Sequence, residues 1–162
     1  MQYRFAFHTV LLGTILSFVH LLLPSSSFGG QTSGCKLQIA RAGQSIGSLG
    51  AVVSDVVSGI NESPHNPFPG KETITFRLGS LSATKTAAKK SADLMNSPAV
   101  QMRLAKQLFT ACPDIVEVRF NLTATDWDSS IFRGEEGSEI KGTCVDPGLG
   151  NDWPLWGFYP CL

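Results

Sequence analysis

The first thirty residues constrain the fold of this chain more than any other segment, because they decide where it folds. Arg4 precedes an apolar run over residues 5–23, and mostly small residues follow over 25–30. A basic N-terminal region, an apolar core and small residues at the cleavage region are typical of an export signal. We therefore expect a signal peptide over residues 1–30 and a secreted mature protein, periplasmic or extracellular, that folds outside the reducing cytoplasm.

The same run leaves two alternatives to cleavage open. It is longer than an ordinary signal core of about 7–15 residues and approaches the roughly 20 residues that span a bilayer. If uncleaved, it would hold a membrane-anchored envelope structural protein, and contact with the membrane is expected only in that case. The second alternative is a lipid on Cys35, which the small residues 32–34 precede.

Four cysteines follow the apolar run: Cys35, Cys112, Cys144 and Cys161. An even number of cysteines in a small exported domain is typical of disulfide bonds. No CxxC motif or paired Cys/His set is present, so we expect no zinc or other metal. A Cys144–Cys161 bond would close a short C-terminal loop and leave Cys35 bonded to Cys112 or free. A bond from Cys112 to one of the two C-terminal cysteines is the competing arrangement.

The size and charge of the chain limit its architecture and partners. After cleavage the 162-residue chain would retain about 130 residues, enough for one domain with one hydrophobic core. The formal net charge is zero, but residues 71–110 are basic and residues 111–162 are acidic, so we expect these two halves to attract each other in the fold. No lysine or arginine run with interleaved aromatic side chains is present, and a nucleic-acid partner is therefore not expected.

Residues 31–70 are predicted to be flexible or loosely ordered. Valines at positions 52, 53, 56 and 57 would share one side of a short helix, which favours a loose helix over residues 50–57. Nearby glycines each weaken such a helix by about 1 kcal/mol. Three prolines then interrupt residues 61–70. We therefore expect the compact domain to cover residues 71–162.

Hydrophobic periodicity predicts an α+β fold for this domain. The predicted elements are strands at 72–78, 115–122 and about 138–145, helices at 81–96 and 98–111, and a polar loop at 125–137. Ser97-Pro98 is typical of a helix start. The order β-α-α-β-β indicates a small two-layer, disulfide-stabilised domain, with a mixed sheet of about three strands covered by two helices. The long helical connection lets the first two strands lie parallel.

Several motifs in this domain occur together in one group of proteins. An Asn96-Ser-Pro98 helix start is paired with a Cys112-Pro113 helix end, and Asp126-Trp127 and Trp156-Gly157 follow before Cys161. These features resemble a group of small exported cyanobacterial proteins without assigned function. The resemblance covers residues 72–161. It implies the boundary of the fold and brings no catalytic residues.

Common catalytic motifs are missing from the sequence. His65 is the only histidine outside the expected signal, and it lies in the proline-rich segment. A Ser/His/Asp or Cys/His hydrolase needs a base held rigidly against its nucleophile, which a loop histidine does not supply. Glycine-rich phosphate-binding motifs are also absent. We therefore assign no catalytic residue and no cofactor.

The polar loop offers oxygen-bearing side chains: Asp126, Asp128, Ser130, Glu135, Glu136 and Glu139. A calcium-binding EF-hand loop that began at Asp126 would need glycine at its sixth position and glutamate at its twelfth, where this chain has Ile131 and Gly137. A solvated hairpin loop is therefore expected. The alternative is a cell-envelope hydrolase that uses a carboxylate pair of residues 126–139.

An aromatic cluster near the C-terminus is the remaining candidate site: Trp153, Trp156, Phe158 and Tyr159. These side chains either form a stacking platform for a ligand or close the small core, since each ring buries about 150–250 Å². The sequence thus favours an exported, disulfide-stabilised binding domain of unknown ligand and without enzymatic activity, with these four residues as candidate binding residues.

Overall fold

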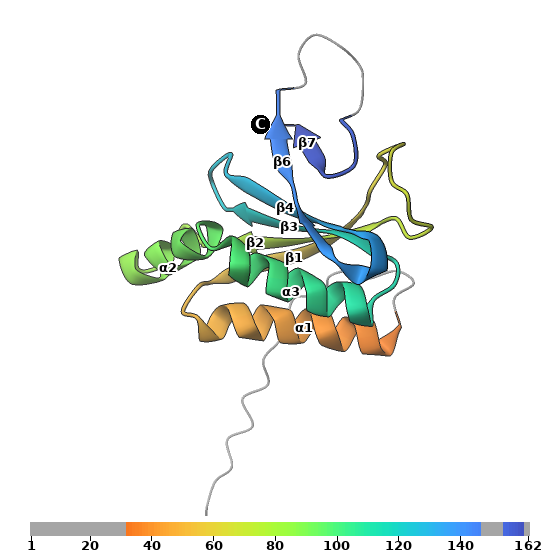
Figure 1. Cartoon of the computed structure of the whole chain (residues 1–162). Helices are drawn as coiled ribbons and strands as arrows, with labels where there is room; N and C mark the ends of the chain where they lie inside the picture. The colour runs from red at the N-terminus through yellow and green to blue at the C-terminus, as the bar shows by residue number, and fades with distance from the viewer. Residues whose placement is uncertain (1–31, 147–153, 161–162) are drawn as a thin grey trace, which may run out of the picture.

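The computed structural model describes residues 32–146 and 154–160 of the chain (Figure 1). The expected signal peptide, Trp153 and Cys161 lie outside these ranges. The described residues form an α+β domain in which helices cover one face of a mixed five-stranded sheet. The predicted two-layer α+β class and mixed sheet are confirmed, but the predicted three strands and two helices are too few. An additional helix and an additional strand precede them in the chain, and further strands follow.

The helices are α1 (Ser33–Ser48), α2 (Lys85–Met95) and α3 (Pro98–Ala111), with a short 3₁₀ turn η1 (Glu135–Gly137). The strands are β1 (Val53–Ile60), β2 (Glu72–Leu78), β3 (Ile115–Leu122), β4 (Asp128–Arg133), β5 (Glu139–Lys141), β6 (Thr143–Val145) and β7 (Phe158–Pro160). The main sheet has the order β1-β2-β3-β4-β5. Only β2 and β3 pair in parallel there, as predicted, because α2 and α3 connect them. β6 and β7 form a separate parallel pair.

The N-terminal part of the predicted loose segment is ordered and packs on the core. Thr32 caps the N-terminus of α1, because its hydroxyl accepts a hydrogen bond from the Cys35 amide, and the helix buries a stripe that includes Ile39 and Ile46. The predicted helix at 50–57 is wrong. Gly50 has a φ of +84°, which ends the helical region, and the β-branched residues that follow form β1. Val56 of β1 pairs with Phe76 and packs on the core.

The predicted polar loop at 125–137 is also wrong, because it contains β4. Ile131 is fully buried, while the neighbouring Ser129 and Ser130 donate hydrogen bonds to Gln101 and Glu117. These long-range partners allow polar residues in a central position of the sheet. The strand predicted at 138–145 is divided at Gly142 into β5 and β6. A Cβ atom at Gly142 would lie 2.8 Å from both the Phe132 ring and the Ser130 carbonyl oxygen, so only glycine fits there.

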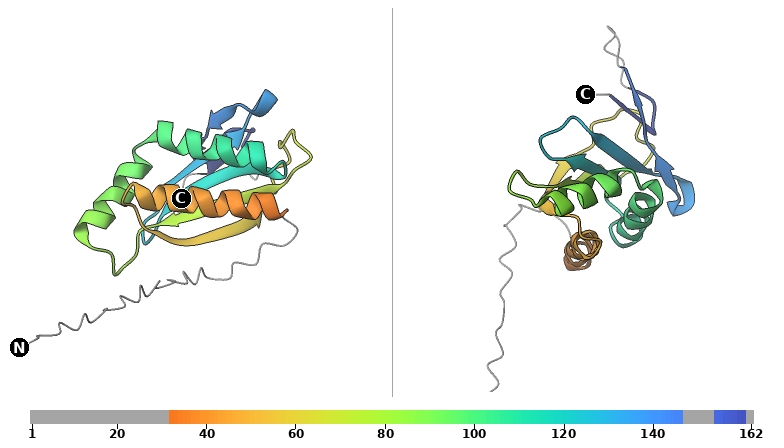
Figure 2. Two further views of the ribbon diagram at one scale, coloured as in Figure 1. Left: turned by 90° about the horizontal axis from the view of Figure 1, so that it is seen from below. Right: turned by 90° about the vertical axis from the view of Figure 1, so that its left-hand side faces the viewer.

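The core lies between the sheet and the two long helices, α1 and α3, which run side by side across one face (Figure 2). Phe76 of β2 and Phe120 of β3 stack at 5.8 Å between ring centroids. Leu104 and Leu108 of α3 are buried above them, as their helical spacing predicts. The C-terminal strands β6 and β7 lie on the opposite side of the sheet from these helices (Figure 1).

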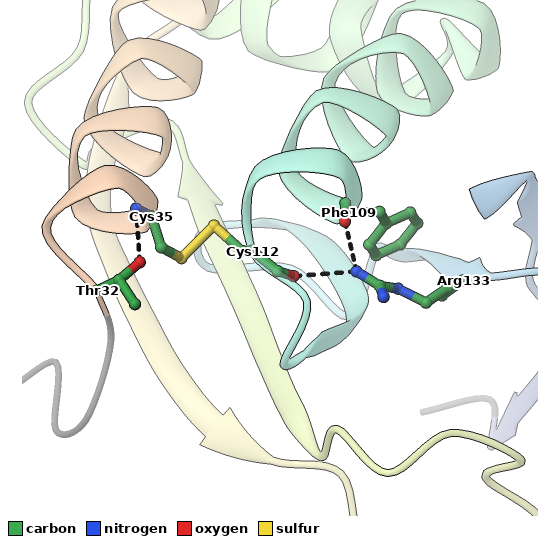
Figure 3. The surroundings of a disulfide bond; sticks show 5 residues. All are labelled: Thr32, Cys35, Phe109, Cys112 and Arg133. Carbon is green, nitrogen blue, oxygen red and sulfur yellow. Dashed lines mark hydrogen bonds between the residues drawn. A yellow bond between two sulfur atoms is a disulfide. The ribbon is translucent and has the colours of Figure 1, made fainter.

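A disulfide joins Cys35 at the start of α1 to Cys112 at the end of α3 (Figure 3). This bond rules out a free or lipid-bearing Cys35 and the competing bonds from Cys112. Cys144 is also disulfide-bonded, and its expected partner Cys161 lies outside the described residues. Arg133 closes the same end of α3, where its guanidinium donates to the carbonyl oxygens of Phe109 and Cys112. No helix of the described ranges is long and apolar enough to cross a membrane.

Candidate functional site

The sheet face that points away from the helices carries a row of polar side chains. Alternate residues of a strand point to opposite faces of the sheet. The residues that alternate with the core positions therefore share this second face. Thr73 pairs with Glu117 across β2 and β3, and Thr75 pairs with Arg119. On the next strand, Phe132 is the partner of Glu117. We call this surface the open face of the sheet.

Glu117 lies at the centre of the open face and is only 2% exposed. Its carboxylate accepts five hydrogen bonds. Oε1 accepts from Nε (3.2 Å) and Nη2 (2.8 Å) of Arg119 and from the Ser130 hydroxyl (2.7 Å). Oε2 accepts from the Asn61 amide (2.8 Å) and the Thr73 hydroxyl (3.0 Å). Such pairing offsets the desolvation penalty of a buried carboxylate.

Arg119 is the exposed partner of this ion pair. Its side chain is 39% exposed, although Nε and Nη2 are both fixed on Glu117. A guanidinium group has five N–H donors in a rigid planar fork. Two donors are used by Glu117, so three have no partner within the described ranges and could bind a ligand, and their orientation is fixed in advance by the buried carboxylate.

A cavity of about 270 Å³ lies over this ion pair. We call it the Arg119 cavity. Its floor is formed by the polar residues of β2 and β3, and one side by the loop that follows β1. The other side is apolar and consists of Phe132, Pro154, Phe158, Tyr159 and Pro160. The volume is just below the roughly 300–1,000 Å³ of cavities that enclose a whole small ligand. The cavity is therefore suited to one end or one side group of a larger ligand.

The predicted aromatic site is only partly assembled. Phe158, which is 41% exposed, and Tyr159 line the Arg119 cavity. The Tyr159 hydroxyl donates to the Asp128 carbonyl oxygen at 3.2 Å. Burial, with a smaller effect from the negative charge of Asp128, raises the pKa of Tyr159 above 10.0.

Trp156 does not line this cavity. Its indole nitrogen donates to the Arg133 carbonyl oxygen at 2.9 Å, and its ring packs edge-on against Phe132 at 5.0 Å and Phe68 at 6.1 Å. Trp156 therefore fixes the C-terminal segment to the sheet, which is the core-closing role that the sequence left open. Trp153 lies outside the described residues.

Glu117 and Arg119 were missed as site residues. Both belong to the polar side of an alternating strand, which ordinarily indicates exposure to solvent. One signal was available: opposite charges two residues apart point to the same face of a strand. Their burial could not be predicted from that spacing, since it depends on the C-terminal segment that covers the open face.

The acidic residues of the predicted polar loop do not converge. Asp126 precedes β4 and Glu135 follows it, and a strand of six residues spans about 20 Å. Asp128 accepts a hydrogen bond from Asn121 at 2.7 Å. Glu139 forms an ion pair with Lys106 at 3.4 Å, which joins the acidic and basic halves of the chain. Within residues 32–146 and 154–160, no three His, Cys, Asp or Glu side chains are grouped to hold a metal ion.

This arrangement does not favour the hydrolase alternative, because a carboxylate pair needs both groups on one substrate. No family model matches the chain, and no curated protein or solved structure matches it either. The resemblance of residues 72–161 to exported cyanobacterial proteins therefore stays a prediction. The fold and the Arg119 cavity are the basis for a functional proposal.

Proposed function

We propose that the protein is an exported, disulfide-stabilised binding domain without enzymatic activity, and that it receives a carboxylate on an apolar group in the Arg119 cavity. The observation that carries this proposal is the guanidinium of Arg119, which is fixed by buried Glu117 and still 39% exposed. Export is supported by the disulfide-bonded cysteines, because such bonds persist in oxidising compartments.

The chemistry of the cavity favours a carboxylate over a phosphate or a cation. The free donors of Arg119 form a planar fork, which matches the two oxygens of a carboxylate. Glu117 already balances the positive charge of Arg119, and Glu62 adds a negative charge to the lining, so the cavity has no excess positive charge to hold a doubly charged anion. The proline and aromatic wall would bury the apolar group that carries the carboxylate. The end of a peptide chain has this combination of groups.

A matched pair of probes tests this proposal. N-acetylphenylalanine and N-acetylphenylalaninamide have the same apolar body, and only the former carries a carboxylate. Titration of the exported protein, followed by nuclear magnetic resonance of the backbone amides of β2 and β3, should show saturable binding of the acid. The amide should bind at least about tenfold more weakly, which corresponds to about 1.4 kcal/mol.

Two variants separate the contributions of the cavity. Arg119→Lys keeps a positive charge beside Glu117 but removes the fork, so it should reduce the preference for the acid over the amide. Phe158→Ala should weaken both probes by similar factors, since it removes only apolar contact. Equal affinity for acid and amide in the unmodified protein, or no binding of either, would contradict the proposal.

A further inference from the structure

A second cavity, larger than the first, lies between the α2–α3 corner and the start of β6. Its volume is about 470 Å³, within the range of small-ligand sites. Its lining includes Asn96, Trp127, Asp128, Lys141 and Tyr159. We call it the Trp127 cavity. Tyr159 lines this cavity and the Arg119 cavity.

The indole of Trp127 is one of the apolar groups that line this cavity. Trp127 is 38% exposed, and among the described residues its ring has no aromatic partner and its Nε1 has no hydrogen-bond acceptor. The main chain is nevertheless fixed. The Trp127 amide donates to the Thr125 hydroxyl at 3.1 Å, and its carbonyl oxygen accepts from the Leu122 amide at 3.0 Å. A large flat ring is thus held in place with more than a third of its surface exposed, and a ligand that covered this surface would gain the free energy of its burial.

The polar groups around the indole are also unoccupied. Asp128 uses Oδ1 to bind Asn121, and Asn96 uses its amide nitrogen to bind the Ala92 carbonyl oxygen. In the part of the chain that the structure describes, Oδ2 of Asp128, Oδ1 of Asn96 and Nζ of Lys141 have no hydrogen-bond partner. With the Trp127 indole, the residues that line the cavity therefore carry two acceptors and two donors without a partner among the described residues.

The charge of the cavity identifies the class of ligand. Asp128 and Lys141 are the charged residues of its lining, and their charges cancel. A single lysine does not form a phosphate or nucleic-acid site, and a single carboxylate does not form a cation site. A mixed set of donors and acceptors matches hydroxyl groups, since each hydroxyl both donates and accepts. A ligand with many hydroxyl groups and one apolar face would also cover the indole.

From these observations we propose that the Trp127 cavity binds a neutral oligosaccharide. The C–H face of one sugar ring stacks on the Trp127 indole, and its hydroxyl groups bind Asp128, Asn96 and Lys141. This proposal does not depend on the function that we propose for the Arg119 cavity. An interface of an aromatic ring with a few placed polar groups is the usual composition of a small-ligand site.

Three neutral probes test this site in the exported protein: cellohexaose, maltohexaose and chitohexaose. We expect at least one of them to shift the nuclear magnetic resonance signal of the Trp127 indole N–H in a saturable manner. The signal is assigned with the variant Trp127→Phe, in which it should disappear. Trp127→Ala should weaken binding at least about tenfold, as measured by calorimetry, whereas Trp127→Phe should retain part of the affinity.

Two further variants keep the test decisive. Asn96→Ala removes one hydroxyl partner on an exposed helix end and should weaken binding severalfold even if Trp127→Ala does not fold. Arg119→Lys should leave oligosaccharide affinity unchanged, which separates this proposal from the one for the Arg119 cavity. The inference is overturned if none of the three hexasaccharides shifts the indole signal, or if Trp127→Ala and Asn96→Ala both bind as tightly as the unmodified protein.

Discussion

Glu117 is the side chain on which the open face of the sheet depends. Its position was predictable from the alternation of β3, but its burial was not, because Asn61 and Ser130, which donate to it, lie far from it in the sequence. Periodicity reports which side chains share a face of a strand and does not report what covers that face. For the same reason the sequence indicated Phe158 and Tyr159 as site residues but did not indicate Glu117 and Arg119, which line the same cavity.

Replacement of Glu117 should be strongly destabilising. Glu117→Ala leaves Arg119 and three other donors without their acceptor, and loss of one partner of a buried pair costs about 3–5 kcal/mol. Glu117→Gln keeps one oxygen acceptor and should lose less, about 1–3 kcal/mol. Urea denaturation followed by circular dichroism measures both values. Exposed Glu135→Ala is the control and should stay within about 0.5 kcal/mol. A loss for Glu117→Ala that is as small as the control's would disprove the role given to the network.

Tyr159 should titrate above its ordinary range in the folded protein. Burial raises its pKa above 10.0, because the charged phenolate is disfavoured. A raised pKa in the folded state means that the stabilising contribution is complete below about pH 10 and is lost as the pH rises through the folded pKa. The chain has two tyrosines, and the other is Tyr3 in the expected signal peptide. Ultraviolet absorbance of a chain that lacks residues 1–30 therefore follows Tyr159 alone. A midpoint that is the same in the folded protein and in urea would contradict the predicted burial.

The elements that were predicted correctly are those whose pattern is local. β2, α3 and β3 have the predicted bounds, because alternation, helical spacing and the Ser97-Pro98 start are all visible in short windows. β1 and β4 were missed for a different reason. The valine spacing of β1 is also typical of a helix. β4 contains adjacent serines whose hydrogen-bond acceptors are distant in the sequence. Pairing across the sheet overrides these local signals.

The contact of α3 with β3 can be tested by truncation of core side chains. Leu104 is 2% exposed and Phe120 is fully buried, so Leu104→Ala and Phe120→Ala should each cost about 2–5 kcal/mol through lost burial and a residual cavity. Lys106→Ala on the exposed side of α3 is the control. It loses an ion pair with Glu139 in which the Lys106 side chain is 63% exposed, so the loss should be about 1 kcal/mol. Equal losses for Lys106→Ala and Leu104→Ala in urea denaturation would show that the helix is rotated.

The complete domain is held together by segments from its two ends. α1 and β1 come from the region predicted to be loose, and they supply core residues that include Ile39 and Ile46. The C-terminal segment covers the open face and forms one wall of each cavity. Neither contribution follows from local composition, since both depend on tertiary contact. We therefore expect the N-terminal segment to be essential for folding, contrary to the sequence-based expectation of a compact domain over residues 71–162.

Removal of residues before Lys71 tests this expectation. The shortened chain would expose the surface of α3 that packs on α1 and the free edge of β2, and it would leave Cys112 without its disulfide partner. We expect it to lose cooperative unfolding, as measured by thermal denaturation with two spectroscopic probes. The full-length double variant Cys35→Ser with Cys112→Ser is the matched control. It removes only the cross-link, so it should still unfold cooperatively but with a stability lower by about 2–5 kcal/mol. If the shortened chain instead unfolds in one transition at a temperature near that of the double variant, α1 and β1 are peripheral to the core and the compact domain begins at β2.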